Sequence, residues 1–200
     1  CSKEMRHFTK SVALMLNPGL GAILMVIGAV FVMIKADTIS GFITSKTLVA
    51  MLPGVTSVVS LLPLAAVCLM ASMVTITAPS ISLEGRNIWI LKSMPIDPRA
   101  VFESKKRLQY AVGLPGTFLL TAALCYAFKL DIMTSACACL TAVAYMLFIT
   151  SFGLMLNLLM PNLEWKDETV PIKQSLPVTI IMFGGWAVVV GLGALYRFLL

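Results

Sequence analysis

LQYAVGLPGTFLLTAALCYAF, residues 108–128, contains no Asp, Glu, Lys or Arg over its whole length. At a rise of 1.5 Å per residue, about 20 predominantly apolar residues in a helix cross the hydrocarbon core of a bilayer. Four more stretches are uncharged for at least this long: Ser11–Ile34, Thr47–Leu83, Ile132–Leu163 and Gln174–Tyr196. The sequence therefore predicts an all-α, polytopic transmembrane helix bundle with about five spans.

The composition favours the same interpretation. Hydrophobic residues make up 59% of the chain and charged residues 12%, and the mean hydropathy is +0.95, whereas soluble domains carry about 25% charged residues. The first residue is Cys1 and the last three are apolar, so we expect a fragment of a longer protein. One transmembrane domain covers residues 1–200, with spans at about 11–34, 48–76, 108–128, 134–159 and 176–197.

The distribution of positive charge predicts an orientation. Between these spans, one set of alternate loops carries 11 Lys and Arg residues and the other set carries four. Positive residues are retained on the cytoplasmic side of a membrane. We therefore expect a multi-pass protein of the plasma membrane, with its N-terminus and residues 80–107 in the cytosol. The net charge of +6 is explained by these juxtamembrane residues, so no nucleic-acid partner is predicted.

The loop after the second span combines charge with tryptophan. It reads SISLEGRNIWILKSMPIDPR over residues 80–99. We expect a short helix across Ser82–Ser93, because the residue before Pro95 resists helical geometry. Asp97 and Pro98 then suit the N-cap and first residue of a helix that continues into the third span. On its surface, Glu103 and Arg107 are four residues apart and can pair.

Two parts of the predicted cytoplasmic face leave alternatives open. Residues 88–91 are apolar on every side of a helix, so they need a cover: the transmembrane bundle itself, the headgroup zone, or a separate cytosolic subunit. The loop PNLEWKDETVPIKQS, residues 161–175, places Trp165 among three acidic residues. That loop is either a solvated turn or a contact with a protein neighbour.

Several catalytic patterns are absent from the sequence. His7 is the only histidine, so no H-E-x-x-H metal site can form. The five uncharged stretches lack the acidic or basic residue that ion-coupled carriers bury. Cys137 and Cys139 would point to opposite sides of a helix, and no G-x-x-x-x-G-K-[ST] phosphate-binding loop is present. The sequence thus predicts no catalytic residue, no metal, no cofactor and no enzymatic activity.

Three passages resemble a known family. KEMRHF with LNPGLG, the segment at 80–99, and PNLEWKDETVPIKQS together resemble the permease subunits of a bacterial family of ATP-binding-cassette exporters. The middle passage carries the pattern S-x-E-G-[KR]-x-x-W-x-L-K-S-x-P.

The resemblance implies a non-enzymatic permease that moves an unidentified substrate with ATP hydrolysed by a separate cytosolic subunit. It also implies the lipid bilayer and a second permease half or copy as partners. The alternative is a channel or membrane scaffold subunit that is not driven by ATP. The coupling residues implied in the first cytoplasmic loop are Glu84, Gly85, Arg86, Trp89, Leu91, Lys92 and Pro95, and those in the second loop are Trp165 and Lys173.

Overall fold

The structure is a computed structural model, and it describes residues 19–43, 62–87, 89, 93, 97–166, 169–173 and 175–199. Within these residues every regular element is helical, in agreement with the predicted all-α class. The elements, in chain order, are α3 (Leu20–Ile34), α4 (Ala36–Ile43), α7 (Leu62–Ala71), the 3-10 helix η2 (Ser82–Asn87), α9 (Pro98–Ala127), α10 (Ile132–Leu159), α11 (Thr169–Lys173) and α12 (Leu176–Leu199).

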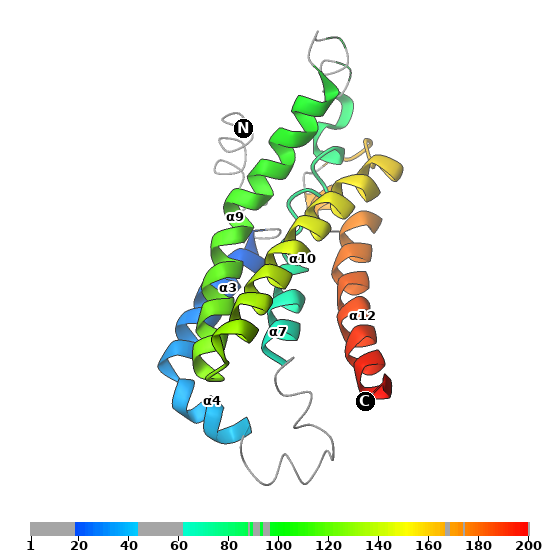
Figure 1. Cartoon of the computed structure of the whole chain (residues 1–200). Coiled ribbons are helices and arrows are strands. Elements are labelled where there is room, and N and C mark those ends of the chain that lie inside the picture. The colour runs from blue at the N-terminus through cyan, green and yellow to red at the C-terminus, as the bar shows by residue number, and fades with distance from the viewer. Residues whose placement is uncertain are drawn as a thin grey trace.

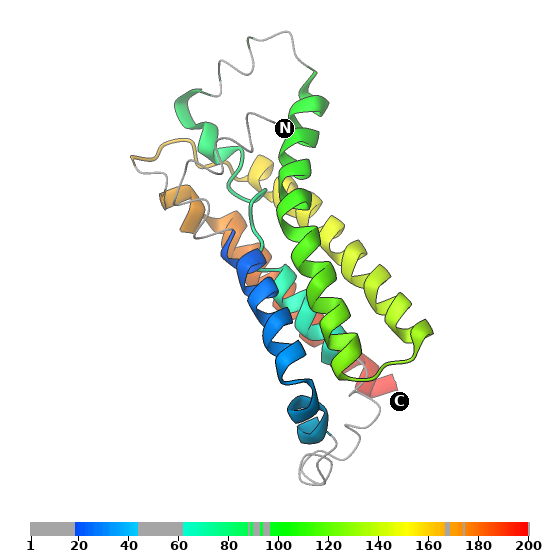
Figure 2. The same cartoon turned by 90° about the vertical axis from the view of Figure 1, so that its left-hand side faces the viewer.

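The helices form an elongated bundle with α7 at its centre (Figures 1 and 2). Helix α7 contacts α3, α9, α10 and α12, while α9 packs along both α3 and α10. The main hydrophobic core includes Met25, Val67, Leu120 and Met146, one from each of four helices. Helix α9 is the long axis of the molecule, and its first turns extend past the other helices at the end where η2 lies (Figure 1).

Three helical stretches among the described residues are long and apolar enough to cross a membrane: Pro98–Ala127, Ile132–Leu159 and Val170–Gly191. The expectation of about five spans is therefore not supported. The described part of the first predicted span is a helix of 15 residues, about 22 Å long at 1.5 Å per residue. The described part of the second contains the 10-residue α7, which ends at Ala71.

The long helices are apolar on the outside. Phe118, Leu140 and Phe183 are more than half exposed, whereas Gln109, Thr150 and Asn157 are fully buried. A water-soluble protein has the opposite distribution of polar and apolar side chains. Such a surface suits a hydrocarbon surrounding, in which buried polar groups join helices to one another.

Helix α9 begins as the sequence predicted. Asp97 is its N-cap, and the Asp97 carboxylate accepts a hydrogen bond from the backbone N–H of Arg99 at 2.9 Å, with Pro98 in the first helical position. The helix then continues without interruption to Ala127. Arg107 and Glu103 form the predicted surface pair at 3.2 Å.

The expected helix across Ser82–Ser93 is only partly confirmed. Residues 82–87 form a 3-10 helix rather than an α-helix, and Gly85 breaks it with φ 51° and ψ −132°. Trp89 and Ser93 are helical. Leu91, Lys92 and Pro95 lie outside the described residues.

Candidate functional site

The chain leaves the helical conformation at Ala71 and yet stays inside the bundle. Residues 72–81, called the buried segment below, are all buried except for the half-buried Met73. Backbone N–H and C=O groups that are shielded from water need hydrogen-bond partners, and a non-helical segment does not supply them by itself. The partners of the buried segment therefore define the candidate site.

The C-terminal end of α7 is fully capped. The carbonyl of Cys68 accepts hydrogen bonds from the backbone N–H of Ser72 at 3.0 Å and from its hydroxyl at 2.9 Å. The carbonyl of Leu69 accepts one from the indole Nε1 of Trp186 on α12 at 3.3 Å. The last two carbonyls of the helix accept from N–H groups three residues further on. All four carbonyls that a helix end leaves unpaired thus have donors.

Gln109, on α9, forms hydrogen bonds with the middle of the buried segment. Its side-chain oxygen accepts from the backbone N–H of Thr77 at 2.7 Å, and its amide nitrogen donates to the carbonyl of Val74 at 2.9 Å. Gln109 is fully buried. One side chain therefore replaces two backbone hydrogen bonds that a continuous helix would have made.

The Thr77 hydroxyl lies between two helices. Its Oγ1 atom is 2.7 Å from the Gln109 oxygen on α9 and 3.0 Å from the backbone carbonyl of Thr150 on α10. A hydroxyl has one proton, so it can donate to one of these acceptors at a time. The close approach needs Gly153 on α10, because a Cβ atom there would lie 2.9 Å from the Thr77 hydroxyl.

Asn157, near the end of α10, holds the last part of the buried segment. Its side-chain oxygen accepts from the backbone N–H groups of Ile81 at 2.7 Å and Ser82 at 3.1 Å. Its amide nitrogen donates to the Ser82 hydroxyl at 2.7 Å, which also accepts from the N–H of Asn162 at 3.0 Å. These bonds fix the start of η2 against α10 and the loop that follows it.

A buried ion pair joins η2 to α9. The ammonium group of Lys105 donates to the Glu84 carboxylate at 2.9 Å and to the carbonyl of Ser80 at 3.0 Å. The Lys105 side chain is 2% exposed and that of Glu84 is 20% exposed. A charge removed from water is tolerated only with close partners, so this contact holds the segment and α9 in one relative position.

Trp165 brings the two predicted cytoplasmic loops together. Its indole Nε1 donates to the carbonyl of Ser82 at 2.7 Å. Its ring lies against Gly85, where a Cβ atom would be 3.2 Å from the indole. Since φ is 51° at Gly85, the position also has a backbone conformation that glycine adopts most easily.

The structure therefore gathers some of the predicted coupling residues and separates others. Glu84, Gly85 and Trp165 lie in one cluster, whereas the Trp89 side chain is 64% exposed. Arg86 belongs to η2 and Lys173 ends α11, and their side chains are outside the described part of the structure. The roles assigned to these residues stay predictions.

Three of the most connected side chains were not among the predicted site residues: Gln109, Lys105 and Asn157. Gln109 is the only amide side chain in residues 108–128, and Asn157 lies well inside an apolar stretch. A lone amide in a membrane-length helix was the available signal. No such signal marks Lys105 in the sequence, because it is one of several juxtamembrane cations.

The site consists mainly of neutral hydrogen-bonding groups around one ion pair. These groups fix the positions of the elements that meet there. No group of three potential metal ligands occurs among the described residues. The arrangement connects the elements at three levels of the bundle. Trp186 and Leu69 join α12 to α7, Thr77 lies between the middle of α9 and α10, and Ser82 joins the loop end to α10.

Comparison with known proteins gives one match. The family model described as "Putative ATP-binding cassette" matches residues 24–175, which include the whole buried segment, η2, α9 and α10. No curated protein and no solved structure matches the chain.

This match corrects two predictions. Its description points to the ATP-binding part of a transporter, so the assignment to the permease subunit is wrong. The expectation that the chain is not an enzyme is contradicted for the same reason. The relation to an ATP-binding-cassette transporter, with partner subunits, is supported. The match does not identify nucleotide-binding residues by itself, since the sequence has no G-x-x-x-x-G-K-[ST] and the described residues include no strand.

Proposed function

Because the chain belongs to the family described as a putative ATP-binding cassette, we propose that it is a membrane-embedded component of an ATP-binding-cassette transporter. Three helical stretches of membrane-spanning length support the membrane placement. The exposed apolar side chains on α9, α10 and α12 support it as well. The end of the molecule that contains η2 and Trp165 is called the polar end below. In this proposal the buried segment couples movements at the polar end to the interior of the bundle.

The proposal rests on the hydrogen bonds that hold the buried segment at both of its ends. At the polar end its continuation, η2, is held by Lys105 and Trp165. In the interior, the segment is held by Gln109 and Thr150 from two membrane-length helices. A displacement of α9 relative to the Trp165 loop therefore cannot occur without breaking or exchanging hydrogen bonds inside the bundle. The Thr77 hydroxyl has two alternative acceptors, and contacts with two discrete arrangements convert small movements into discrete changes.

The polar end is proposed to face the cytosol. Residues 80–107 carry six Lys and Arg residues, and positive residues are retained on the cytoplasmic side of a bilayer. Helix α9 projects from this end (Figure 1). In this orientation its first turns and Trp89 are available to a partner subunit of the transporter.

Trp89 is the contact residue proposed for that partner. A large aromatic side chain that is 64% exposed contributes little to the stability of its own chain, and tryptophan is enriched at the energetic centres of protein interfaces. We expect Trp89→Ala to leave membrane retention and the free energy of unfolding unchanged. We expect the same substitution to lower ATP hydrolysis by the assembled transporter.

The experiment uses the full-length protein purified from membranes together with the proteins that co-purify with it. Retention after carbonate extraction tests membrane embedding. ATP hydrolysis is then measured for the isolated chain and for the assembly, each with Trp89→Ala and with Phe118→Ala as a control that truncates another exposed aromatic side chain, on the membrane-length helix α9. Release of the chain by carbonate would overturn the membrane placement. Equal hydrolysis by wild-type and Trp89→Ala assemblies would overturn the role of the exposed tryptophan.

A further inference from the structure

A groove lies between α3 and α9 on the outside of the bundle. Its volume is about 370 Å³, which is in the range of small-molecule sites. Three of its lining side chains on α3 are between 41% and 58% exposed: Ile23, Val26 and Ile27. The groove therefore opens toward the surroundings of the bundle and not toward its core.

Small residues form the floor of this groove. Gly19, Ala22 and Gly116 line it and are buried. A Cβ atom at Gly116 would lie 3.2 Å from the carbonyl oxygen of Ala22, so α3 and α9 approach closely there. From Gly19 to Ile27 the lining extends about 12 Å along the axis of α3. A narrow groove of this length between two helices suits part of an alkyl chain rather than a compact ligand.

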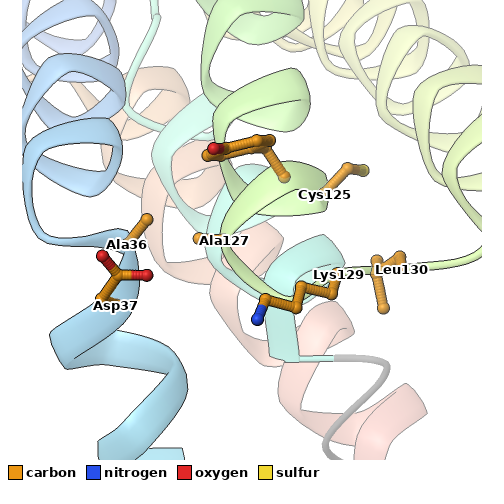
Figure 3. A pocket seen from close by; sticks show the side chains of 7 residues that line it. Ala36, Asp37, Cys125, Ala127, Lys129 and Leu130 are labelled. Carbon is orange, nitrogen blue, oxygen red and sulfur yellow. The ribbon is translucent and has the colours of Figure 1, made fainter.

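The polarity of the groove also suits hydrocarbon. Among the described residues that line it, none has a charged or hydroxyl side chain. The pocket at the other end of α9 is different, because its lining includes Asp37 and Lys129 (Figure 3). A charged ligand group in the groove would meet no side chain of opposite charge, and a charge inside a bilayer is costly. The part of a ligand that contacts the groove is therefore expected to be neutral.

Pro115 gives the groove one hydrogen-bond acceptor. Proline has no backbone N–H, so the carbonyl of Ala111, four residues earlier in α9, lacks its usual helical donor. A helical carbonyl is directed at the residue four positions later, and here that residue is Pro115, which lines the groove. The hydroxyl of Thr117 donates to the carbonyl of Gly113 at 2.9 Å. A backbone acceptor in an apolar environment needs a donor, so the Ala111 carbonyl favours a ligand with an O–H or N–H group.

We propose that this groove binds a neutral, single-chain amphiphile whose headgroup donates a hydrogen bond to the carbonyl of Ala111, as a monoacylglycerol can. The alkyl chain lies along α3 from Ile23 to Ile27. Ala111 is one helical turn beyond Arg107, the last charged residue of α9. The headgroup therefore lies toward the polar end and the chain extends into the membrane. This step rests on the membrane placement in the proposed function.

The test uses the full-length protein in nanodiscs of phosphatidylcholine, a lipid whose headgroup has no O–H or N–H donor. One probe is a 1-monoacylglycerol with a diazirine on its chain. The other is the methyl ester of the same fatty acid, which has no donor. Photolabelling of α3 and α9 is measured by peptide mapping at increasing probe concentration, and gives an apparent Kd for each probe.

Two variants and one control separate the hydrogen bond from the shape of the groove. Pro115→Ala restores a backbone N–H for the Ala111 carbonyl, and alanine favours the helix, so lost binding cannot be attributed to unfolding of α9. Val26→Phe fills the groove. Val188→Phe is the matched control, because Val188 is 48% exposed on α12 and lies outside the groove.

The monoacylglycerol is expected to bind the wild-type protein with a lower apparent Kd than the methyl ester. Pro115→Ala raises the Kd of the monoacylglycerol about fivefold, corresponding to about 1 kcal/mol, and leaves that of the methyl ester unchanged. Val26→Phe weakens the binding of both probes and Val188→Phe of neither. Equal Kd values of the two probes with the wild type, or equal effects of Pro115→Ala on both, would overturn the role of the Ala111 carbonyl. Unchanged labelling of Val26→Phe would overturn the groove as the site.

Carbonate extraction of the same wild-type protein separates this proposal from the proposed function. Release from membranes would overturn both. Retention with no effect of Pro115→Ala and Val26→Phe would overturn only the amphiphile site.

Discussion

At the scale of single residues, Gln109 decides whether the buried segment can exist. It supplies hydrogen bonds to the N–H of Thr77 and the carbonyl of Val74 in a place that water does not reach. Leaving a buried polar group unpaired costs about 1–3 kcal/mol. Gln109→Leu leaves two such groups, so we expect it to lower the free energy of unfolding by about 3 kcal/mol, measured by denaturant titration in mixed micelles.

The control for Gln109→Leu is Thr141→Val. The Thr141 hydroxyl also donates to a backbone carbonyl, that of Cys137 at 2.8 Å, but the residue is exposed on α10. Its removal should change the free energy of unfolding by less than about 0.5 kcal/mol. A similar small loss for Gln109→Leu would show that the N–H of Thr77 and the carbonyl of Val74 do not depend on Gln109 for their hydrogen bonds.

Lys105 offers a second comparison at this scale, because helix α9 takes part in a buried ion pair, Lys105–Glu84, and in an exposed one, Arg107–Glu103. Lys105→Met leaves the Glu84 carboxylate without its ammonium donor at 2.9 Å. Removing one partner of a buried pair costs about 3–5 kcal/mol, and the partial exposure of Glu84 places this case near the lower limit. Arg107→Met breaks the exposed pair with Glu103 and should cost about 0.2–1 kcal/mol. Equal losses in thermal or denaturant unfolding of the two variants would contradict the assigned role of Lys105.

At the scale of elements, the kink of η2 depends on Gly85. Its φ of 51° with ψ of −132° is a conformation that strains any other residue by about 1–3 kcal/mol, and the Trp165 ring leaves little room for a Cβ atom. We expect Gly85→Ala to destabilise the protein by at least about 1 kcal/mol. Gly191→Ala is the matched control, because Gly191 lies in α12 with no atom within 4 Å of the new methyl group. The melting temperature should fall for the first variant and stay unchanged or rise for the second.

The elements also show what the sequence could predict. Helices α9, α10 and α12 follow from long uncharged stretches, and the start of α9 follows from the Asp97-Pro98 pair, because both signals are local. The described part of the second window is not one continuous helix, and the reason is non-local. Its Ser and Thr residues are compatible with a membrane helix by hydropathy alone, and Thr77 finds its partner 32 residues away, on Gln109. Hydropathy records the cost of polar groups but not the identity of the groups that satisfy them.

The candidate site shows the same difference between local sequence signals and non-local contacts. The sequence pointed to Glu84, Gly85 and Trp165 as coupling residues through the resemblance of their passages to a known family. It did not indicate that Trp165 bonds the carbonyl of Ser82, 83 residues earlier. It also placed Lys105 among the juxtamembrane cations and did not indicate that its side chain is buried, with 2% exposed. Contacts between loops at one end of a bundle depend on how the intervening helices pack, and no local pattern contains that information.

At the scale of the whole molecule, the proposed membrane placement requires the two ends of the bundle to face different compartments. Ser93 lies beyond η2 and Ile132 begins α10 after the α9–α10 turn, and both are exposed. In a protein whose five cysteines are replaced, we expect a membrane-impermeant maleimide added to intact cells to label Ile132→Cys and not Ser93→Cys. After the membrane is opened, both variants should be labelled, which excludes poor accessibility as the reason for the difference. The reason is that the basic residues at 80–107 retain that end in the cytosol while α9 carries the chain across. Labelling of Ser93→Cys alone in intact cells would invert the orientation, and labelling of both would mean that α9 does not cross the bilayer.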